Sequence, residues 1–309
     1  MHILAAPLQE YTCAPFRLAH ARAIGGVDEY YMPFARLEKG QVPRRAAEDL
    51  MPERNAGCNS VPQILVRDGE ETRRLVEYVL ALGYRRIDFN FGCPFPKLTS
   101  RGYGAGILAE PAAVSSVLES ARQYADVGFS AKMRLGLTSP DDAFALLPLL
   151  NGFPFVQLVL HPRTAAQQYS GIPDRDAFLR FRDKCHHPLF YNGDIVLPEN
   201  AAGLDAVMAG RGLLAMPDLP LRLRGQEPPA GCMEAFHREF VLETRRLCRQ
   251  PLQSLKLLWN YFLPDAGKKA RKALAKAKTM DEYLEISAAI FRDREAGLEA
   301  AGQHGSQAQ

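Results

Sequence analysis

The stretch that decides the fold is Arg86-Ile87-Asp88-Phe89-Asn90-Phe91-Gly92-Cys93-Pro94. Its first half alternates in polarity and favours extended backbone, which predicts a short strand. Gly92 and Pro94 end that strand, so Cys93 is expected on the loop just beyond its C-terminal end. A thiol there can act as a nucleophile, an acid or a ligand, but a free cysteine is more often a small buried hydrophobe. The stretch alone leaves both roles open.

The length and composition indicate a globular protein of two parts. A chain of 309 residues suits a barrel of about 200–250 residues followed by a smaller domain. With 47% apolar and 24% charged residues, it can build a large core. The net charge of +3 is too small to indicate a nucleic-acid partner by itself. The positive excess lies after residue 231, where 13 Lys and Arg residues accompany 10 Asp and Glu residues.

The cysteine spacing and the hydropathy pattern exclude several classes of protein. The six cysteines contain no Cys-x-x-Cys pair, so the sequence predicts neither a zinc site nor a disulfide framework, and no metal ligands are assigned. No charged-then-apolar leader precedes the first predicted strand, and no run of 18 apolar residues occurs. We therefore expect a soluble, cytoplasmic monomer with no membrane partner.

Strands and helices alternate over the first 231 residues. The predicted strands lie at residues 2–7, 29–32, 61–66, 86–91, 129–134, 155–160, 189–191 and 205–209. Amphipathic helices are predicted between most of them, at 15–24, 70–82, 110–124, 139–150, 174–185 and 198–203. Residues 38–58 are polar and are expected to form a loop or a weak helix. Eight such units predict an α/β fold, a (β/α)₈ TIM barrel over residues 1–231.

Polar and reactive residues gather where seven of the eight predicted strands end. In a barrel these ends share one face, and that face carries the active site. Each residue alone has an ordinary explanation, such as a surface charge or a core histidine, but their common placement favours a functional site. The residues are Pro7, Gln63, Asn90, Cys93, Lys132, Arg134, His161, Arg163, Asn192, Asp194 and Arg211.

Glycines follow the last two predicted strands, at Gly193 and in Gly210-Arg211-Gly212. Barrels commonly bind phosphate at this place, through backbone N–H groups that need a close approach. The sequence therefore predicts a phosphorylated ligand or cofactor. Gly102-Tyr103-Gly104-Ala105-Gly106 has no strand directly before it, so a flexible loop is predicted there rather than a dinucleotide site.

The chain after residue 231 has a helical pattern only. Helices are predicted at 233–249, 252–263, 267–278 and 280–295, a small all-helical domain over residues 232–296. Lysines crowd the third helix, and the surface they form is either a solvated face or a contact with a phosphate backbone. Trp259 and Tyr261 are expected in the core of this bundle. Residues 297–309 lack apolar content and are predicted to be disordered.

Several short motifs occur in order along the chain: Ala6-Pro7, Asn90-Phe91-Gly92-Cys93-Pro94, Gly104–Leu108, Lys132-Met133-Arg134-Leu135-Gly136, His161-Pro162-Arg163-Thr164, Gln168-Tyr169-Ser170-Gly171, Asn192-Gly193-Asp194-Ile195 and Gly210-Arg211-Gly212. Through these motifs the chain resembles, over nearly its whole length, the dihydrouridine synthases, which reduce uridine in tRNA with FMN. Leu8 stands where that family has methionine, and Pro162 where it has glycine.

The resemblance implies an oxidoreductase, a tRNA-dihydrouridine synthase that takes electrons from NADPH or NADH. Hydride is added to C6 of uracil and a proton to C5, with Cys93 as the general acid. It implies an FMN site formed by Ala6, Pro7, Leu8, Gln63, Lys132, His161, Asn192, Gly193, Asp194, Gly210 and Arg211. It implies contacts with tRNA from Asn90, Lys97, Arg101, Arg134, Arg163, Lys268, Lys269 and Lys272.

Two alternatives remain. A flavin barrel acting on a free small molecule, such as a dihydroorotate dehydrogenase-like enzyme, has similar phosphate loops but gives no reason for the basic helical domain. A non-catalytic RNA-binding relative has no need of Cys93 and Lys132.

Overall fold

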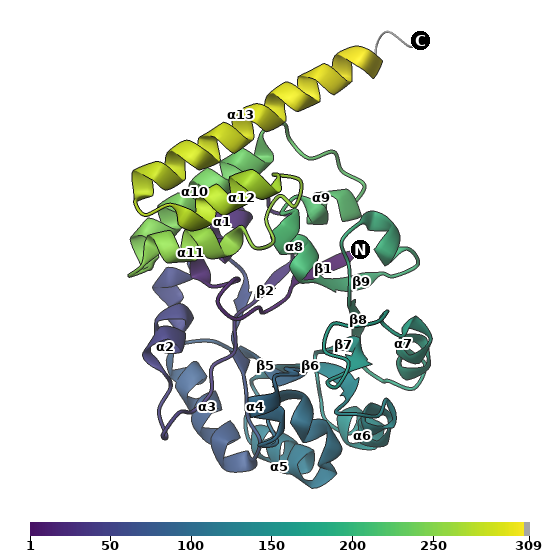
Figure 1. The fold of residues 1–309 in the computed structure, drawn as a ribbon. Coiled ribbons are helices and arrows are strands. Elements are labelled where there is room, and N and C mark those ends of the chain that lie inside the picture. Colours follow the sequence, from purple (N-terminus) through teal and green to yellow (C-terminus); the bar gives the residue numbers. More distant parts are fainter. Residues whose placement is uncertain (306–309) are drawn as a thin grey trace.

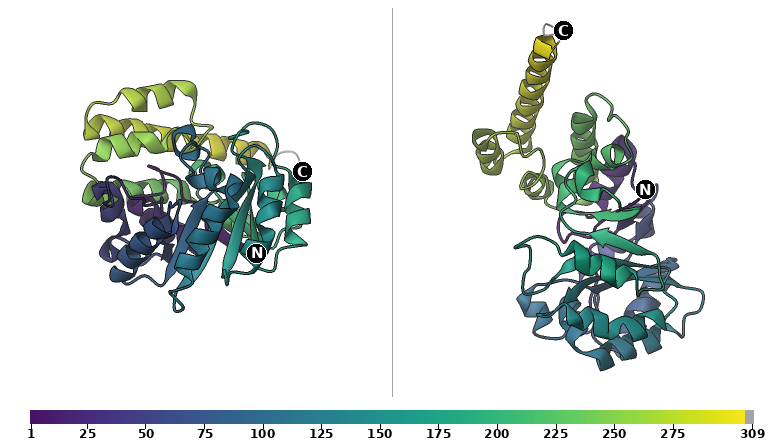
Figure 2. Two further views of the ribbon diagram at one scale, coloured as in Figure 1. Left: turned by 90° about the horizontal axis from the view of Figure 1, so that it is seen from below. Right: turned by 90° about the vertical axis from the view of Figure 1, so that its right-hand side faces the viewer.

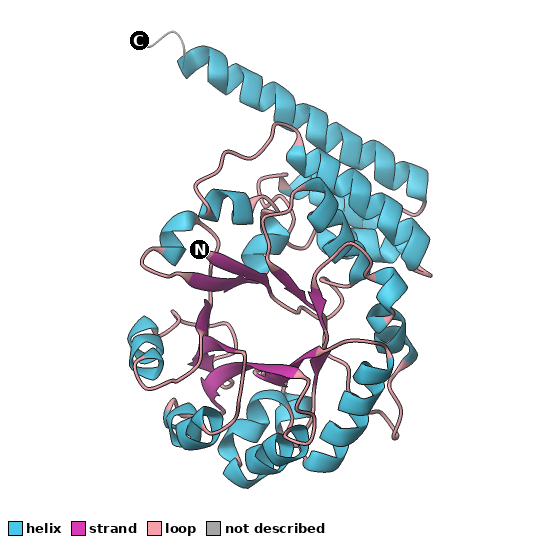
Figure 3. Cartoon of the chain, turned by 180° about the vertical axis from the view of Figure 1, so that it is seen from behind, coloured by secondary structure: helices cyan, strands magenta, loops and turns pink. Residues whose placement is uncertain are grey.

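The computed structural model describes residues 1–305, with side chains up to Glu295, and residues 306–309 lie outside the described part. One parallel sheet curls round in the order β3-β2-β1-β9-β8-β7-β6-β5-β4, and Figure 3 shows its strands as a ring with helices outside. The strands are β1 (His2–Ala5), β2 (Glu29–Tyr31), β3 (Ser60–Val61), β4 (Gln63–Ile64), β5 (Arg86–Phe91), β6 (Gly128–Gly136), β7 (Gln157–Thr164), β8 (Leu189–Asn192) and β9 (Ala206–Ala209).

The ring is completed at Pro62, which separates β3 from β4. β3 pairs with β2, and β4 pairs with β5, so the two short strands act as one. Pro62 has no N–H for the ladder, but its carbonyl accepts from the backbone N–H of Asp88 at 2.9 Å. Counted in this way the sheet has eight strands, and the predicted TIM barrel is confirmed.

Most helices outside the barrel form where the apolar spacing predicts them, and those at residues 211–215 and 219–223 were not predicted. In α3 (Gly69–Ala81) the buried side chains include Leu75, Val76 and Val79, and the carboxylate of Asp68 caps the first turn. The other barrel helices are α1 (Ala14–Ala23), α5 (Pro111–Ala121), α6 (Asp141–Asn151), α7 (Arg175–Arg182), α8 (Arg211–Ala215) and α9 (Leu219–Leu223), with the 3₁₀ turn η3 (Pro198–Ala201). In the region expected to be a loop or weak helix lie α2 (Arg44–Leu50) and η1 (Pro52–Arg54).

β7 extends further than the sequence predicts. The expected strand ends before His161-Pro162-Arg163, whereas β7 continues through these residues to Thr164. The pairing of β6 with β7 shifts between Arg134 and Gly136, which leaves an irregularity beside Pro162. A proline is tolerated in a strand at such a bulge because no ladder hydrogen bond is needed from it.

The glycine-rich segment after Cys93 is compact, so the prediction of a flexible loop there was wrong. It forms α4 (Pro96–Thr99) and the buried 3₁₀ turn η2 (Gly104–Ala109). A Cβ on Gly104 would lie 2.6 Å from the carbonyl oxygen of Cys93, and one on Gly106 would lie 2.3 Å from that of Thr99. These glycines therefore allow close packing against the Cys93 loop rather than movement.

The four C-terminal helices are α10 (Cys232–Leu247), α11 (Pro251–Leu258), α12 (Lys268–Lys276) and α13 (Met280–Gly305). α10 packs against α1 of the barrel, and α13 projects beyond the barrel (Figures 1 and 2). The buried hydroxyl of Tyr283 bonds Nε2 of His237 at 2.7 Å and the indole N–H of Trp259 at 2.8 Å, so Trp259 lies in the predicted core. α13 reaches Gly305, whereas the sequence predicts disorder from residue 297.

Among residues 1–305, no helix combines the length and the apolar character needed to cross a membrane.

Candidate active site at the barrel mouth

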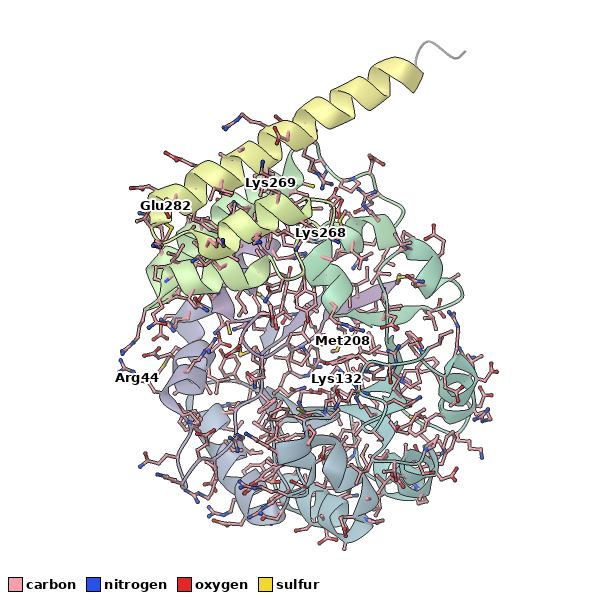
Figure 4. All side chains as sticks on the ribbon, in the orientation of Figure 1. Arg44, Lys132, Met208, Lys268, Lys269 and Glu282 are labelled. Carbon is pink, nitrogen blue, oxygen red and sulfur yellow. The ribbon has the colours of Figure 1, made fainter. Side chains whose placement is uncertain are left out.

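A cavity of about 890 Å³ opens at the C-terminal ends of the strands. Lys132, from the middle of β6, lies within the barrel in Figure 4. Most of the residues predicted for the cofactor and the reaction line this cavity. They are Ala6, Pro7, Leu8, Asn90, Cys93, Lys132, Arg134, His161, Asn192, Gly193, Asp194, Gly210 and Arg211.

Cys93 lines the cavity on a loop that is held from both sides. The side-chain oxygen of Asn90 accepts from the N–H groups of Gly92 (3.1 Å) and Cys93 (2.9 Å). On the other side, the N–H of Ala105 donates to the carbonyl of Cys93 at 3.0 Å. Burial raises the pKa of the Cys93 thiol, although Arg134 and Lys132 act in the opposite direction. The thiol is therefore protonated at neutral pH, as a general acid must be.

Asn90 presents a single donor to the cavity. Its oxygen is occupied by the two backbone N–H groups, and its Nδ2 donates one hydrogen to Oε1 of Gln63 at 2.8 Å. An amide nitrogen has two hydrogens, so one remains. The acceptor of this amide is thus used within the protein, and the donor that remains suits a carbonyl oxygen.

The ammonium of Lys132 has no carboxylate within 4.0 Å and no hydrogen-bond partner among the described residues. Burial lowers the pKa of Lys132 to about 8; nearby Arg134 acts in the same direction, and Asp88 and Cys93 oppose it. Lys132 is half-buried, and a cation that is largely removed from water without a partner is costly. Lys132 therefore needs an anionic or strongly polar ligand in the cavity.

His161 is a neutral donor. Its Nε2 lies 3.1 Å from Nη1 of Arg163, and a guanidinium can only donate. Nε2 is therefore the acceptor, and the proton is on Nδ1. Burial lowers the pKa of His161 far below its ordinary value, and the cations Lys132, Arg134, Arg163 and Arg211 add to this effect. The residue that the resemblance implies for the FMN site is therefore a neutral N–H donor.

Arg163 does not line the cavity, and its hydrogen bonds are all made within the protein. It donates to both carboxylate oxygens of Asp194 (3.1 and 2.5 Å), to the carbonyls of Ser170 and Gly171, and to His161. A guanidinium has five N–H groups, and these contacts use all of them. The predicted contact of Arg163 with tRNA is therefore replaced by a structural role.

Arg134 is only partly available to a ligand. Its Nε donates to the carbonyl of Gly92, and its Nη1 donates to the carbonyls of Thr164 and Gln168. Only Nη2 is left on the cavity side, near the ring of Tyr169. Arg134 thus ties the loops after β5 and β7 together and has one nitrogen to offer.

The loops after β8 and β9 present unpaired backbone N–H groups to the cavity. The N–H groups of Gly193, Arg211 and Gly212 have no acceptor among the described residues. A Cβ on Gly212 would lie 2.0 Å from the carbonyl oxygen of Ile195. The guanidinium of Arg211, 2.8 Å from Asp194, also lines the cavity. Free N–H groups, close backbone and a guanidinium fit a phosphate.

Several cavity residues were not predicted from the sequence. Asn260 and Tyr261 reach the cavity from the segment after α11, where Nδ2 of Asn260 donates to the hydroxyl of Tyr11 at 3.2 Å and the two tyrosine rings meet edge to face at 5.1 Å. Tyr261 was expected in the bundle core, and that expectation was wrong. Tyr169 lies with its ring 4.3 Å from the guanidinium carbon of Arg211. Of these three cavity residues, only Tyr169 lies in a motif that the sequence analysis identified.

The remaining predicted residues lie outside the cavity. Gln63 is fully buried beneath Asn90. Lys97 on α4 and Arg101 just after it are exposed. Lys268, Lys269 and Lys272 are exposed on α12, and Figure 4 shows the first two on the helical part of the protein, above Lys132.

The family model and the sequence relatives that this chain matches are dihydrouridine synthases. A family model described as "Dihydrouridine synthase (Dus)" matches residues 3–285. A tRNA-dihydrouridine(16) synthase of Ralstonia nicotianae is 32% identical over 66% of this chain and 67% of the relative. One of Aquipseudomonas alcaligenes is 28% identical over 74% and 78%. A solved structure, a variant of NCR from Zymomonas mobilis, matches with a TM-score of 0.48 and 14% identity over 76% and 90%.

Proposed function

This chain belongs to the dihydrouridine synthase family and is an oxidoreductase that forms dihydrouridine in tRNA, and we propose that it reduces the uridine at position 16. The named relatives carry that position in their names, and the matched part of this chain spans about two thirds or more of each. The observation that carries the chemistry is Cys93, held at the cavity with a protonated thiol beside Lys132.

FMN is the cofactor that the cavity fits. The free N–H groups of Gly193, Arg211 and Gly212, with the guanidinium of Arg211, would hold its phosphate. Lys132 and the Nδ1–H of His161 would donate to its ring system, and the ammonium would stabilise negative charge there. When bound and reduced by NADPH, FMN supplies the hydride that uracil accepts at C6.

The protein's own residues place the base and deliver the proton. The free N–H of Asn90 donates to a carbonyl oxygen of the uracil and so fixes the ring beside Cys93. The thiol of Cys93 gives its proton to C5. Because the cavity lies within a barrel mouth, the target uridine has to leave its stack to enter it. Tyr11, Phe34 and Tyr261 line the cavity with aromatic surface.

Deleting the gene should remove dihydrouridine from position 16 of the tRNAs of its host and leave other dihydrouridines in place. Primer extension or mass spectrometry of individual tRNAs, compared with a complemented strain, measures this. The purified protein with NADPH should restore the modification to tRNA from the deletion strain and should not reduce free uridine or orotate. Loss at another position would refute position 16, and reduction of free orotate would favour the small-molecule alternative.

The lysine-rich face of α12 is proposed to contact the tRNA backbone. Lys256 and Arg271 donate to backbone carbonyls, so they belong to the fold. Lys268, Lys269 and Lys272 are exposed and have no ion-pair partner within 4.0 Å in the described part of the chain. Lys276 and Lys278 beside them are exposed too, so the three lysines belong to a larger basic surface that is free to bind phosphates.

Reversing the charge of Lys268, Lys269 and Lys272 to glutamate should weaken tRNA binding. The slope of log affinity against log salt should become shallower by roughly 0.7–0.9 for each phosphate that the variant no longer binds. The matched control reverses Arg180, Arg182 and Lys184, three exposed cations at α7, which gives the same change in net charge. Equal losses in both variants would mean a general effect of charge, and no loss at α12 would mean a merely solvated face.

A further inference from the structure

Only two Phe, Tyr or Trp side chains are exposed among residues 1–295, and both belong to loops at the barrel mouth. Tyr169 lines the cavity, and its ring centre lies 4.3 Å from the guanidinium carbon of Arg211 and 5.3 Å from that of Arg134. Phe95 is 54% exposed, and in the described part of the chain no other ring or cation packs on its ring. A single exposed apolar side chain is ordinary, so the place of Phe95 and the way its ring is held decide its meaning.

The backbone of Phe95 is fixed on both sides. Pro94 and Pro96 flank it, and a residue before proline is restricted to extended backbone; Phe95 has φ −65° and ψ 120°. Its carbonyl accepts from the N–H groups of Leu98 at 2.8 Å and Thr99 at 3.0 Å. The ring is therefore presented to solvent on a stiff turn, and little backbone freedom is lost when a ligand covers it.

Phe95 stands two residues after the general acid but outside the cavity. Cys93 and Pro94 line the cavity, whereas Phe95 does not. The ring therefore faces whatever lies at the rim rather than a group that is held inside. When a uridine leaves its stack and enters the cavity, the nucleotides on either side of it stay at the rim.

The charge around Phe95 favours RNA as its partner. Lys97 on α4 and Arg101 just after it are both exposed, and neither has an ion-pair partner within 4.0 Å in the part of the chain that the structure describes. Proteins commonly bind single-stranded nucleic acid with an aromatic ring that stacks on a base and with cations that bind the phosphates. The stretch from Phe95 to Arg101 holds both kinds of group on one short turn.

We propose that Phe95 stacks on the base of a nucleotide directly next to the flipped uridine and so binds the RNA at the rim of the cavity. This inference rests on the proposed function, because it needs a uridine that has left its stack to reach Cys93. It makes Phe95 a substrate-binding residue, with an apolar contact that adds to the phosphate contacts expected from Lys97 and Arg101.

The first test is Phe95→Leu, which removes the flat ring but keeps an apolar side chain. Single-turnover formation of dihydrouridine by the FMN-loaded enzyme is measured over a range of tRNA concentrations. The half-saturating concentration should rise about 5- to 100-fold, the effect of losing one stacked base. The rate at saturating tRNA should stay at the wild-type value, because the stack holds the ground state and the transition state alike.

Phe95→Trp separates stacking from support of the neighbouring Cys93 loop. An indole also stacks on bases, so this variant should bind tRNA at least as tightly as the wild type. A side chain that only supports the loop would give the opposite result. Phe95→Leu would then lower the rate at saturating tRNA, and the larger indole would not restore it.

A tRNA with an abasic site next to the target uridine shows whether the partner is a base. Removing the stacked base should weaken binding to the wild type about as much as Phe95→Leu does, and the two changes together should add nothing further. Abasic sites on the 5′ and 3′ sides, tested separately, identify the neighbour. Fully additive losses at both sites would refute the stack.

The contact is also visible in the fluorescence of Phe95→Trp. The one native tryptophan, Trp259, is buried, and its signal is subtracted with the wild type. A stacked base should quench the introduced indole when tRNA is added. The matched control is Val156→Trp, since Val156 is exposed just before β7, at the end of the barrel opposite the cavity, and its indole should not be quenched.

Wild-type affinity for tRNA in Phe95→Leu, or equal quenching in Phe95→Trp and Val156→Trp, would overturn the proposal. A weaker response to NADPH with unchanged tRNA affinity would overturn it too, because the ring would then bind the reductant. Failure of the proposed function looks different: the wild type itself would form no dihydrouridine at position 16. Normal modification there by the wild type, with unchanged tRNA affinity in Phe95→Leu, would reject the stacking role alone.

Discussion

Cys93→Ala is expected to form dihydrouridine in tRNA about 10²–10⁴-fold more slowly than the wild type, the loss typical of a removed general acid. NADPH oxidation measured without RNA should not change, because nothing in that reaction requires a thiol. The measurement is single-turnover formation of dihydrouridine, with enzyme in excess over tRNA, beside NADPH consumption in the absence of tRNA. Retained flavin and an unchanged melting curve show that the variant is intact.

The control for this prediction is Cys185→Ala. Burial raises the pKa of Cys185 as it does that of Cys93, but Cys185 lies after α7 and does not line the cavity. It should therefore leave dihydrouridine formation unchanged. If the role of Cys93 is structural, Cys93→Ala should lose a little stability and should affect both measurements equally. Normal formation of dihydrouridine by Cys93→Ala would refute the assignment of Cys93 as the general acid.

Sequence reasoning succeeded where strand ends determine position. Asn90 and Asn192 follow from the period and the breaks of single strands, because parallel strands deliver their ends to one face. Lys132 also lines the cavity, although it lies in the middle of β6 and not at its end. No long-range information is needed for these residues once the barrel is inferred. The place of the glycines after β8 and β9 at the cavity follows in the same way, and their role in binding phosphate stays a prediction.

Sequence reasoning failed where a role depends on what a side chain already contacts. Arg163 has the residue type and the place of a phosphate ligand, but five internal contacts use its donors. Tyr261 has the pattern of a core residue, but the segment after α11 carries it to the cavity beside Tyr11. Both outcomes depend on packing between segments far apart in the chain, which periodicity does not describe.

The effect of Pro162 on its strand also depends on a contact with another segment, which the sequence does not show. A proline directly after an apolar run normally marks the end of a strand, and the sequence alone favours that ending. The bulge between β6 and β7 removes the need for its N–H. β7 therefore carries both His161 and Arg163, and their side chains meet at 3.1 Å. The tautomer of His161 follows from this arrangement.

Lys132→Met is expected to stabilise the apoprotein while it weakens the retention of FMN. At neutral pH the lysine is charged in the folded state at a free-energy cost, because burial lowers its pKa from 10.5 to about 8. A shift of this size corresponds to a penalty of about 1–3 kcal/mol after allowance for solvent near the cavity. Methionine fills a similar volume and carries no charge, so it removes that penalty.

The sign of the pH dependence follows from the lowered pKa. The unfolded lysine holds its proton up to about pH 10.5, whereas the folded lysine loses it above about pH 8. The unfolded state therefore binds more protons in this window, and the contribution of Lys132 to stability rises with pH there. The advantage of Lys132→Met should be largest at pH 7 and should shrink by pH 9, as measured by urea unfolding of both apoproteins.

The effect on FMN should run the other way. Removing one partner of a buried, charged hydrogen bond costs about 2 kcal/mol or more of binding free energy. The affinity for FMN should therefore fall by at least about thirtyfold. Equilibrium dialysis measures it, with Lys97→Met as the control, since Lys97 is exposed on α4 outside the cavity. A Lys132→Met apoprotein that is less stable than wild type, or that holds FMN as tightly, would mean that the lysine already has its partner within the protein. The expected outcome, a more stable apoprotein that binds FMN more weakly, would show that the unpaired cation destabilises the barrel and is retained because it binds the cofactor.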